Sequence, residues 1–365
     1  MLKRITGLLL AALLCFLGFF TCAAETSPEE VTAGRAGKAA EDTKTEEAAA
    51  TEEGNSTGEE TKGEEETGPA ATAEEGAFPE LNGEGFLDSG EFVYENPDEG
   101  IWRYASATLW VEVRRIIQPK PARTWYEAEI RCADDGDHPH MIANNPDKLL
   151  KSKPQYPYKI ARSNRTVIAI NNDYAQDRLG WGKKLGTVIR NGTVFGKKYP
   201  KKNSANFPNL DCLAIWPDGD MKAFNSDEMT SEQYLEAGVR DVLAFGPILI
   251  RDGELNEAGL KKYGTTKQPR TAVGMVKKGH YWFMMLEGRV KRSNGDSVRF
   301  LAEKMLEKGC TLGFNLDGGQ SSCIVFMGHQ LCLIKQGKPH LSSRSTADIL
   351  GAGESELVPA VGDPW

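Results

Sequence analysis

The pattern of apolar and polar residues predicts a chain built mainly from β-strands. Short stretches rich in aromatic and β-branched residues, bounded by glycine, proline, asparagine or aspartate, recur along most of its length. Asn191-Gly192, Asp218-Gly219 and Lys278-Gly279 each separate two such stretches, which predicts three hairpins. The predicted strands lie within residues 92–117, 125–131, 166–170, 185–194, 213–224, 241–253, 270–276, 280–286, 311–316 and 323–326.

Two other stretches predict helices. Residues 298–306 place apolar side chains at the i, i+3, i+4, i+7, i+8 spacing of a helix with one buried face, namely Val298, Leu301, Ala302, Met305 and Leu306. Ser297 can cap this helix, and Gly309 can take the left-handed turn that ends it. Residues 229–237 predict a second helix, capped by Thr230 or Ser231. The fold class is therefore α+β, with mixed or antiparallel sheets, a few helices and a site on loops at strand ends.

Polar groups follow the ends of several predicted strands. Asp317 comes directly after the strand at 311–316, and Gly318 and Gly319 then allow backbone N–H groups to approach a ligand closely. Taken alone, Asp317-Gly318-Gly319 favours a simple hairpin turn between the strands at 311–316 and 323–326.

Two further strand ends carry charge. Asp173 follows the strand at 166–170, and the strand at 280–286 ends in Glu287-Gly288-Arg289. Arg270 opens the neighbouring strand, and its planar guanidinium suits phosphate or carboxylate. A surface cluster of ion pairs at hairpin ends would give the same pattern.

The first 24 residues have the features of a secretory signal peptide: Lys3 and Arg4, an apolar run at 8–20, and small residues up to Ala24. The same segment is long enough to remain as a membrane anchor, and Cys22 offers a third alternative, a lipidated first residue. We therefore expect the protein to be secreted or held at the cell surface.

Residues 25–77 contain no aromatic residue and carry 16 acidic against 4 basic side chains. Such a segment cannot bury enough apolar surface to fold, so it is predicted to be a disordered acidic linker. It accounts for the acidic balance of the whole chain, and the remaining residues 78–365 are nearly neutral. This charge distribution argues against a nucleic-acid partner.

Metal and disulfide chemistry have weak support. The cluster DDGDHPH at 134–140 could be a metal loop, but it matches no calcium-loop spacing and fits a solvated turn as well. No zinc motif is present, and the metal requirement stays open. Beyond the leader, the cysteines number five, without regular spacing, so they predict no disulfide framework, although one bridge can form outside the cytoplasm.

Taken together, the strand-end motifs resemble those of the phosphodiester glycosidase family. The similarity runs from about residue 124 to 351, so residues 124–365 are expected to form the family domain and residues 78–123 a β-rich segment before it. The matching motifs are INNDY (170–174), RNG (190–192), FGP (245–247) with DG (252–253), PRTAVG (269–274), EGR (287–289) and NLDGGQSS (315–322).

This resemblance implies hydrolysis of the glycosidic bond of a sugar-1-phosphodiester, of the N-acetylglucosamine-1-phosphodiester or cell-envelope glycan type. Phosphate is a good leaving group, so the protein must mainly hold its charge and support positive charge at the anomeric carbon. The implied catalytic candidates are Asp317, Glu287 and Asp173. The implied substrate-binding residues are Asn171, Gly246, Arg270, Thr271, Arg289, Gly318, Gly319, Ser321, Ser322 and Arg344. No cofactor is expected, although a divalent cation can assist, and the expected partner is a carbohydrate phosphodiester.

Three departures from the family pattern keep alternatives open. Asn172 replaces a usual glycine, Glu287 a usual aspartate, and Gln320 a third glycine. The first alternative is therefore a non-catalytic module that binds cell-envelope glycan in the same cleft. A second is a structural module. A third is a serine hydrolase that uses Ser321 or Ser322 with His280, His329 or His340, although GGQSSC is not a nucleophile elbow.

Overall fold

A computed structural model describes residues 79–176, 186–198, 210–333 and 343–364. The chain divides into two units, Met1–Gly68 and Pro69–Trp365, and the second contains all the described residues. The predicted signal peptide and acidic linker lie outside the described residues. Among the residues that are described, no helix is long and apolar enough to cross a membrane.

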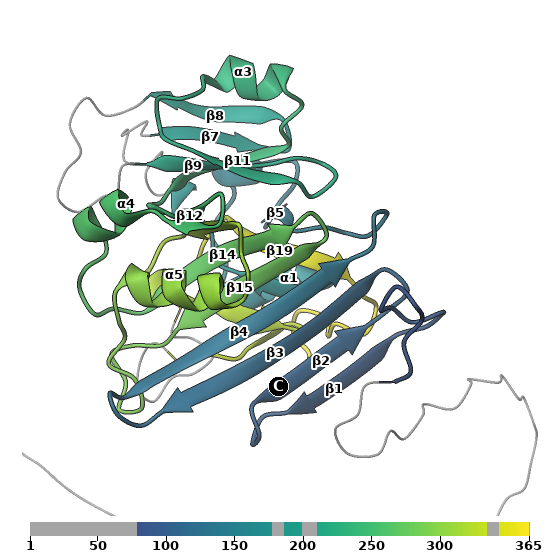
Figure 1. Cartoon of the computed structure of the whole chain (residues 1–365). Coiled ribbons are helices and arrows are strands. Elements are labelled where there is room, and N and C mark those ends of the chain that lie inside the picture. Colours follow the sequence, from purple (N-terminus) through teal and green to yellow (C-terminus); the bar gives the residue numbers. More distant parts are fainter. Residues whose placement is uncertain (1–78, 177–185, 199–209, 334–342, 365) are drawn as a thin grey trace, which may run out of the picture. The chain divides into compact units, whose positions relative to one another are not determined.

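Three sheets of mostly antiparallel strands form the fold (Figure 1). The largest has nine strands in the order β1-β2-β3-β4-β15-β14-β16-β12-β13. Its strands are β1 (Phe92–Asn96), β2 (Ile101–Ala105), β3 (Leu109–Gln118), β4 (Arg123–Cys132), β12 (Ile248–Arg251), β13 (Glu254–Leu255), β14 (Arg270–Lys277), β15 (His280–Leu286) and β16 (Leu312–Asn315).

Two five-stranded sheets complete the set, in the orders β10-β9-β11-β7-β8 and β18-β17-β6-β19-β5. The first consists of β7 (Gly186–Arg190), β8 (Thr193–Lys198), β9 (Asp211–Ile215), β10 (Met221–Phe224) and β11 (Asp241–Phe245). The second consists of β5 (His140–Ala143), β6 (Thr166–Ile170), β17 (Ile324–Phe326), β18 (His329–Gln330) and β19 (Asp348–Glu354).

The helices are short, which together with the sheets confirms the α+β prediction. They are α1 (Pro157–Ser163), α3 (Ser231–Glu236), α4 (Glu257–Lys262) and α5 (Val298–Glu307), with 3₁₀ turns at Leu149–Lys151 and Gly319–Ser321. Helix α5 packs on the large sheet near β14 and β15 (Figure 1). Thr230, one of the two predicted caps, caps helix α3, and it forms a capping box with Gln233.

The hairpin predictions are confirmed. Asn191-Gly192 joins β7 to β8, Asp218-Gly219 lies between β9 and β10, and Lys278-Gly279 joins β14 to β15. Both Asn191 and Gly192 have positive φ (44° and 71°), the geometry that matches the twist of a tight hairpin.

Helix α5 confirms most of its prediction. It begins after Ser297, and Gly309 follows its end with φ of 80°. Two details were wrong: the Ser297 side chain makes no capping hydrogen bond, and Leu306 is 37% exposed. Leu306 lies at the edge of the apolar stripe, whereas its neighbour Met305 is fully buried.

The interpretation of Asp317-Gly318-Gly319 as a hairpin turn is contradicted by the topology. Strand β16, before it, pairs with β12 and β14 in the nine-stranded sheet, whereas β17, after it, pairs with β6 and β18 in another sheet. The residues at 317–322 therefore carry the chain from one sheet to another, where they can contribute to a site. The Gly246-Pro247 pair, which is cis, likewise separates β11 and β12 into different sheets.

Residues before 124 belong to the same sheet as the residues that follow. Strand β3 pairs with β4 along ten residues, and β4 pairs with β15. The β-rich segment predicted at 78–123 thus extends the nine-stranded sheet to its β1 edge.

We predict that Leu301→Ala on α5 lowers the free energy of unfolding by about 3 kcal/mol, because this side chain is fully buried against the large sheet. Leu306→Ala on the same helix is the matched control and should cost less than about 1 kcal/mol. Urea unfolding monitored by circular dichroism measures both, and equal losses would contradict the packing of α5.

Candidate functional site

A cavity of about 360 Å³ lies where the loop before β14 approaches the loops that follow β11, β15 and β16. Six of the residues predicted from the sequence line it: Gly246, Arg270, Arg289, Asp317, Gly318 and Gly319. The other lining residues are Phe245, Pro247, Lys262, Tyr263, Gly264, Thr265, Thr266, Gln268 and Asn315.

Asp317 is placed by the end of β16 and fixed by the loop that follows. Its Oδ1 accepts a hydrogen bond from the Gly318 N–H at 2.9 Å, and its own C=O accepts one from the Asn171 side chain at 2.8 Å. The Asp317 side chain is 15% exposed, so it lies at the cavity wall and remains accessible to a ligand.

Gly318 and Gly319 let this loop lie directly against the two arginines. A Cβ on Gly318 would be 3.5 Å from Nη1 of Arg270, and a Cβ on Gly319 would be 3.2 Å from Nη2 of Arg289. Gly319 also has φ of 64°, which a side chain would strain. Glycine is therefore required for close contact between loop and guanidinium groups.

Arg270 is mostly buried and held by backbone oxygens. Its guanidinium donates to the C=O groups of Thr266 (2.7 Å), Asp296 (3.3 Å) and Gly264 (3.4 Å). Burial is the main reason that the pKa of Arg270 falls to about 10; Asp317 opposes the shift and Arg289 adds to it. The group stays positively charged at neutral pH and carries its charge at the cavity.

Arg289 is held in place by a neutral partner. Its Nε and Nη2 both donate to Oε1 of Gln268, at 2.9 and 2.5 Å. Among the residues that the structure describes, neither Arg270 nor Arg289 has a carboxylate within ion-pair distance. Two positive charges without a direct ion-pair partner among the described residues thus face one cavity, which is the arrangement expected of a site for an anion.

Arg344 also lies near Asp317, although it is not among the residues that line the cavity. Its Nη1 lies 3.8 Å from Oδ2 of Asp317, and its guanidinium lies 4.7 Å from the centre of the Tyr174 ring. The Arg344 N–H donates to the Gln320 C=O at 2.8 Å, which ties it to the loop after Asp317. Gln320 itself has ordinary negative φ, so this departure from the family pattern causes no backbone strain.

Glu287, a predicted catalytic residue, lies outside the cavity lining and is fully buried. Its carboxylate accepts hydrogen bonds from Arg292 (2.5 and 2.7 Å), from the Leu333 N–H (2.7 Å) and from the Tyr126 hydroxyl (3.3 Å). These contacts join the end of β15 to the chain after β18. Glu287 has one methylene more than the aspartate that is usual in the family, and its carboxylate reaches these partners.

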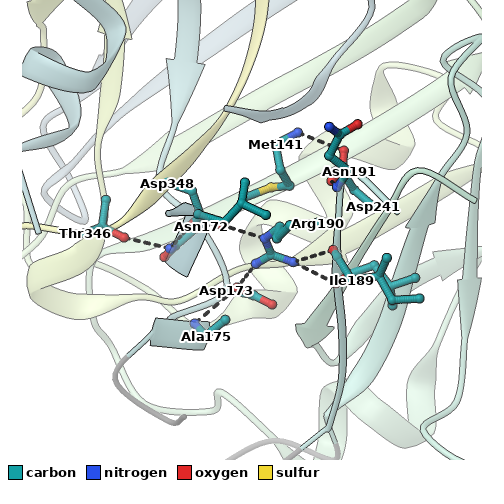
Figure 2. A network of polar contacts seen from close by, with 12 residues as sticks. Met141, Asn172, Asp173, Ala175, Ile189, Arg190, Asn191, Asp241, Thr346 and Asp348 are labelled. Carbon is teal, nitrogen blue, oxygen red and sulfur yellow. Dashed lines mark hydrogen bonds and ion pairs between the residues drawn. The ribbon is translucent and has the colours of Figure 1, made fainter. Parts of the chain in front are cut away.

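Asp173, another predicted catalytic residue, is part of a buried ionic network (Figure 2). It accepts from Arg190 Nη2 at 2.6 Å, and from the N–H groups of Ala244 (2.8 Å) and Ala175 (3.2 Å). Arg190 also donates to Asp348 at 2.7 Å. Burial opposes the charge of Arg190, but the coulombic attraction of Asp173 and Asp348 outweighs it and raises the pKa of Arg190. The network links the two five-stranded sheets.

Asn171 and Asn172 connect this network to the cavity. Asn171 donates to the Asp317 C=O and accepts from the Cys323 N–H at 3.0 Å. Asn172 donates to Asp348 and, at 2.7 Å, to the Thr346 hydroxyl. The side chain that replaces a usual glycine of the family thus takes part in the buried network.

The predicted hydroxyl and amide donors differ in their availability. The N–H groups of Gly318, Gly319, Ser321 and Ser322 all donate to acceptors within the protein. By contrast, the hydroxyls of Thr271, Ser321 and Ser322 are buried without a hydrogen-bond partner in the described part of the chain. No described histidine bonds to either serine; His280 pairs with Glu129, and His340 lies outside the described residues.

The hypothetical metal loop at 134–140 forms a turn in which His138 is buried against the Tyr281 hydroxyl, 3.0 Å away. No group of three or more histidine, cysteine, aspartate or glutamate side chains that could hold a metal occurs among the described residues. All five described cysteines are buried, and no disulfide joins any two of them.

Sequence reasoning missed several residues of the site. Lys262 ends α4, and Tyr263 and Gln268 lie in the loop between α4 and β14, where no motif marked them. Arg292 and Asp348 were missed because nothing in the sequence places them beside Glu287 and Arg190. The polar stretch at 264–268, just before PRTAVG, was the one sequence signal that could have indicated this part of the cavity wall.

Comparison with known proteins decides the family. The model of the phosphodiester glycosidase family matches residues 164–352, slightly more than half of the chain. The chain belongs to the phosphodiester glycosidase family. This confirms the resemblance read from the strand-end motifs, and it places the chain in a family of glycosidase-type hydrolases.

Two relatives illustrate the range of similarity. An uncharacterised SPbeta prophage-derived protein of Bacillus subtilis, YomE, is 28% identical over 183 residues, which are 49% of this chain but only 27% of YomE. The catalytic domain of zebrafish N-acetylglucosamine-1-phosphodiester alpha-N-acetylglucosaminidase, auto-inhibited by its pro-peptide, superposes with a TM-score of 0.52 at 18% identity, over 68% of this chain and 85% of that one. The latter similarity shows a shared fold.

We predict that Arg190→Met lowers the free energy of unfolding by about 3 to 5 kcal/mol, because it leaves the buried carboxylates of Asp173 and Asp348 unpaired. Arg114→Met is the control: this side chain is 54% exposed and pairs with Glu112, so its loss should cost about 1 kcal/mol or less. Chemical denaturation compares the two, and a small effect at Arg190 would contradict the network.

We also predict that Gly319→Ala weakens binding of inorganic phosphate about fivefold or more, because the added methyl group displaces Arg289. Gly309→Ala has the same backbone strain (φ of 80°) with no atom within 4 Å, so both variants should lose about 1 kcal/mol of stability. Phosphate-induced shifts in melting temperature measure binding. Unchanged binding in Gly319→Ala would argue against the cavity as an anion site.

Proposed function

We propose that this protein hydrolyses the glycosidic bond of a sugar-1-phosphodiester, of the N-acetylglucosamine-1-phosphodiester or cell-envelope glycan type. The observation that carries the proposal is the pair Arg270 and Arg289, which face the cavity beside Asp317 without acidic partners in the described residues. A phosphodiester supplies the missing negative charge. Family membership supplies the reaction class.

In the proposed reaction the phosphate lies against Arg270 and Arg289, and the sugar carbon lies toward Asp317. The bond between the anomeric carbon and the phosphate oxygen breaks, and its electron pair leaves with the phosphate monoester. The two guanidinium groups stabilise this charge as it develops. Because the phosphate leaves without a proton, one carboxylate is sufficient where most glycosidases use two.

Asp317 is the carboxylate that we assign to the chemistry. Glu287 and Asp173 are both fully buried and saturated with hydrogen bonds, so we assign them positioning roles. Asp317 either attacks the anomeric carbon, forming a glycosyl ester that water then hydrolyses to free sugar, or removes a proton from a water molecule that attacks this carbon directly. The first path retains the configuration of the sugar and the second inverts it, so the released anomer distinguishes them.

The second candidate is a module that binds a glycan phosphodiester without cleaving it. It is favoured by one observation: Asp317 is the single carboxylate among the described residues that line the cavity. In either case we propose that the protein acts in a secreted or cell-surface location, supported by the leader at 1–24 and the acidic segment at 25–77.

We predict that the full chain releases free sugar from at least one member of a panel of sugar-1-phosphodiesters, assayed with and without a chelator. Asp317→Asn should reduce the rate about 10³-fold or more, and Arg270→Met about 10²-fold. Asp252→Asn and Arg251→Met, which lie outside this cavity, are the matched controls and should retain activity.

If the folded wild-type protein binds members of the panel but cleaves none, the hydrolase proposal is wrong and the binding module is favoured. Turnover that survives Asp317→Asn would remove Asp317 from the mechanism.

A further inference from the structure

Strands β17 and β18 form a tight hairpin that follows the Asp317 loop in the sequence. Met327 and Gly328 make the turn, both with positive φ (45° and 74°). Val325 lies opposite Gln330 and Phe326 opposite His329. This turn geometry fixes the register of the two strands.

The register brings two cysteines opposite each other. The Leu331 N–H donates to the Ile324 C=O at 3.0 Å, which extends the ladder by one pair beyond the strands themselves. Continued by one more residue, the same register sets Cys323 opposite Cys332, just beyond the ends of the two strands. Because hydrogen-bonded and non-hydrogen-bonded pairs alternate, this pair is of the non-hydrogen-bonded kind, in which Cα atoms are about 4.5 Å apart. Disulfides span Cα separations of about 4.4 to 6.8 Å.

The two sulfurs occupy the same buried region. Opposite residues in a hairpin place their side chains on one face, and both cysteines belong to one apolar cluster with no exposed surface. Burial is the main reason that the pKa of Cys323 is raised, and Cys332 adds to the rise, so the two thiols lie close enough to interact.

The other three described cysteines lie elsewhere in the fold. Cys132 ends β4, Cys212 is in β9 of another sheet, and Cys310 precedes β16. None of them is a register partner of another cysteine in the described ladders. Cys323 and Cys332 are therefore the pair that the fold presents for bonding.

We propose that Cys323 and Cys332 form a cross-strand disulfide when the chain folds in an oxidising environment. Each thiol gives up its proton, the two sulfurs form one S–S bond, and a small-molecule disulfide such as oxidised glutathione takes up two electrons and two protons to become two thiols. In a reducing compartment the same pair stays as thiols.

Burial determines when the bond can form. Burial raises the pKa of Cys332 to about 12 and that of Cys323 well above its ordinary value, so the native thiols are protonated and unreactive. Oxidation therefore occurs while the hairpin is still open, during folding.

The bond would join the two ends of the β17–β18 hairpin, and both ends contact residues that hold Asp317 or Glu287. The Cys323 N–H donates to Asn171, which holds the Asp317 C=O. Cys332 precedes Leu333, whose N–H donates to Glu287. A bridge here closes a short ring and joins the supports of Asp317 and Glu287.

The test is refolding of the reduced, full-length protein in a glutathione redox buffer, followed by alkylation and pepsin digestion at acidic pH. Cleavage after Phe326 leaves two fragments, one with each cysteine, that stay together only if the disulfide is present. We expect linked fragments that separate on reduction, and a melting temperature about 5 °C higher than that of the reduced protein.

Cys310→Ser is the matched control and should keep both the linked fragments and the rise in melting temperature. Cys323→Ser and Cys332→Ser should lose both. Alkylated Cys323 and Cys332, or either one bonded to another cysteine, would overturn the proposal. If refolding yields are low, the same mapping on protein purified from an oxidising expression compartment gives the same two outcomes. Neither readout depends on catalytic activity.

Discussion

The buried pairing of Arg190 with Asp173 and Asp348 is the interaction on which the rest of the structure depends (Figure 2). These residues come from β7, the end of β6 and the start of β19, so one guanidinium joins the two five-stranded sheets. Such a cluster is stable only when every member has its partners, since an unpaired buried charge costs several kcal/mol. The end of β6 is therefore rigid, and through Asn171 it holds the loop of Asp317.

The same residue type has the opposite role at the cavity. Arg190 is enclosed by carboxylates, whereas Arg270 is held by three backbone oxygens and Arg289 by one amide oxygen. Carbonyl groups fix the position of a guanidinium without neutralising it. The cavity thus keeps two positive charges, and Arg270 is mostly buried with no direct ion pair in the described part of the chain. The contrast explains why one arginine is structural while the other two belong to the site.

The sequence predicted local structure well because turn chemistry and helical spacing are local. Asn191-Gly192 and the apolar stripe of α5 needed no information from distant residues. It also gathered six cavity residues, since strand-end motifs of one family converge in space. It could not distinguish a hairpin from a crossover at Asp317, because that depends on which strands pair. For the same reason it could not show that Glu287 and Asp173 are saturated by Arg292 and Arg190, which lie elsewhere in the chain.

The central claim is that Arg270 and Arg289 hold the phosphate of a sugar phosphate. Calorimetric titration with a sugar 1-phosphate tests it most directly, because binding is measured without turnover. The account predicts that the wild type and Asp317→Asn bind, that Arg270→Met and Arg289→Met each lose about tenfold or more in affinity, and that Arg251→Met behaves as wild type. Equal affinity in all five proteins, or no binding by the folded wild type, would contradict it.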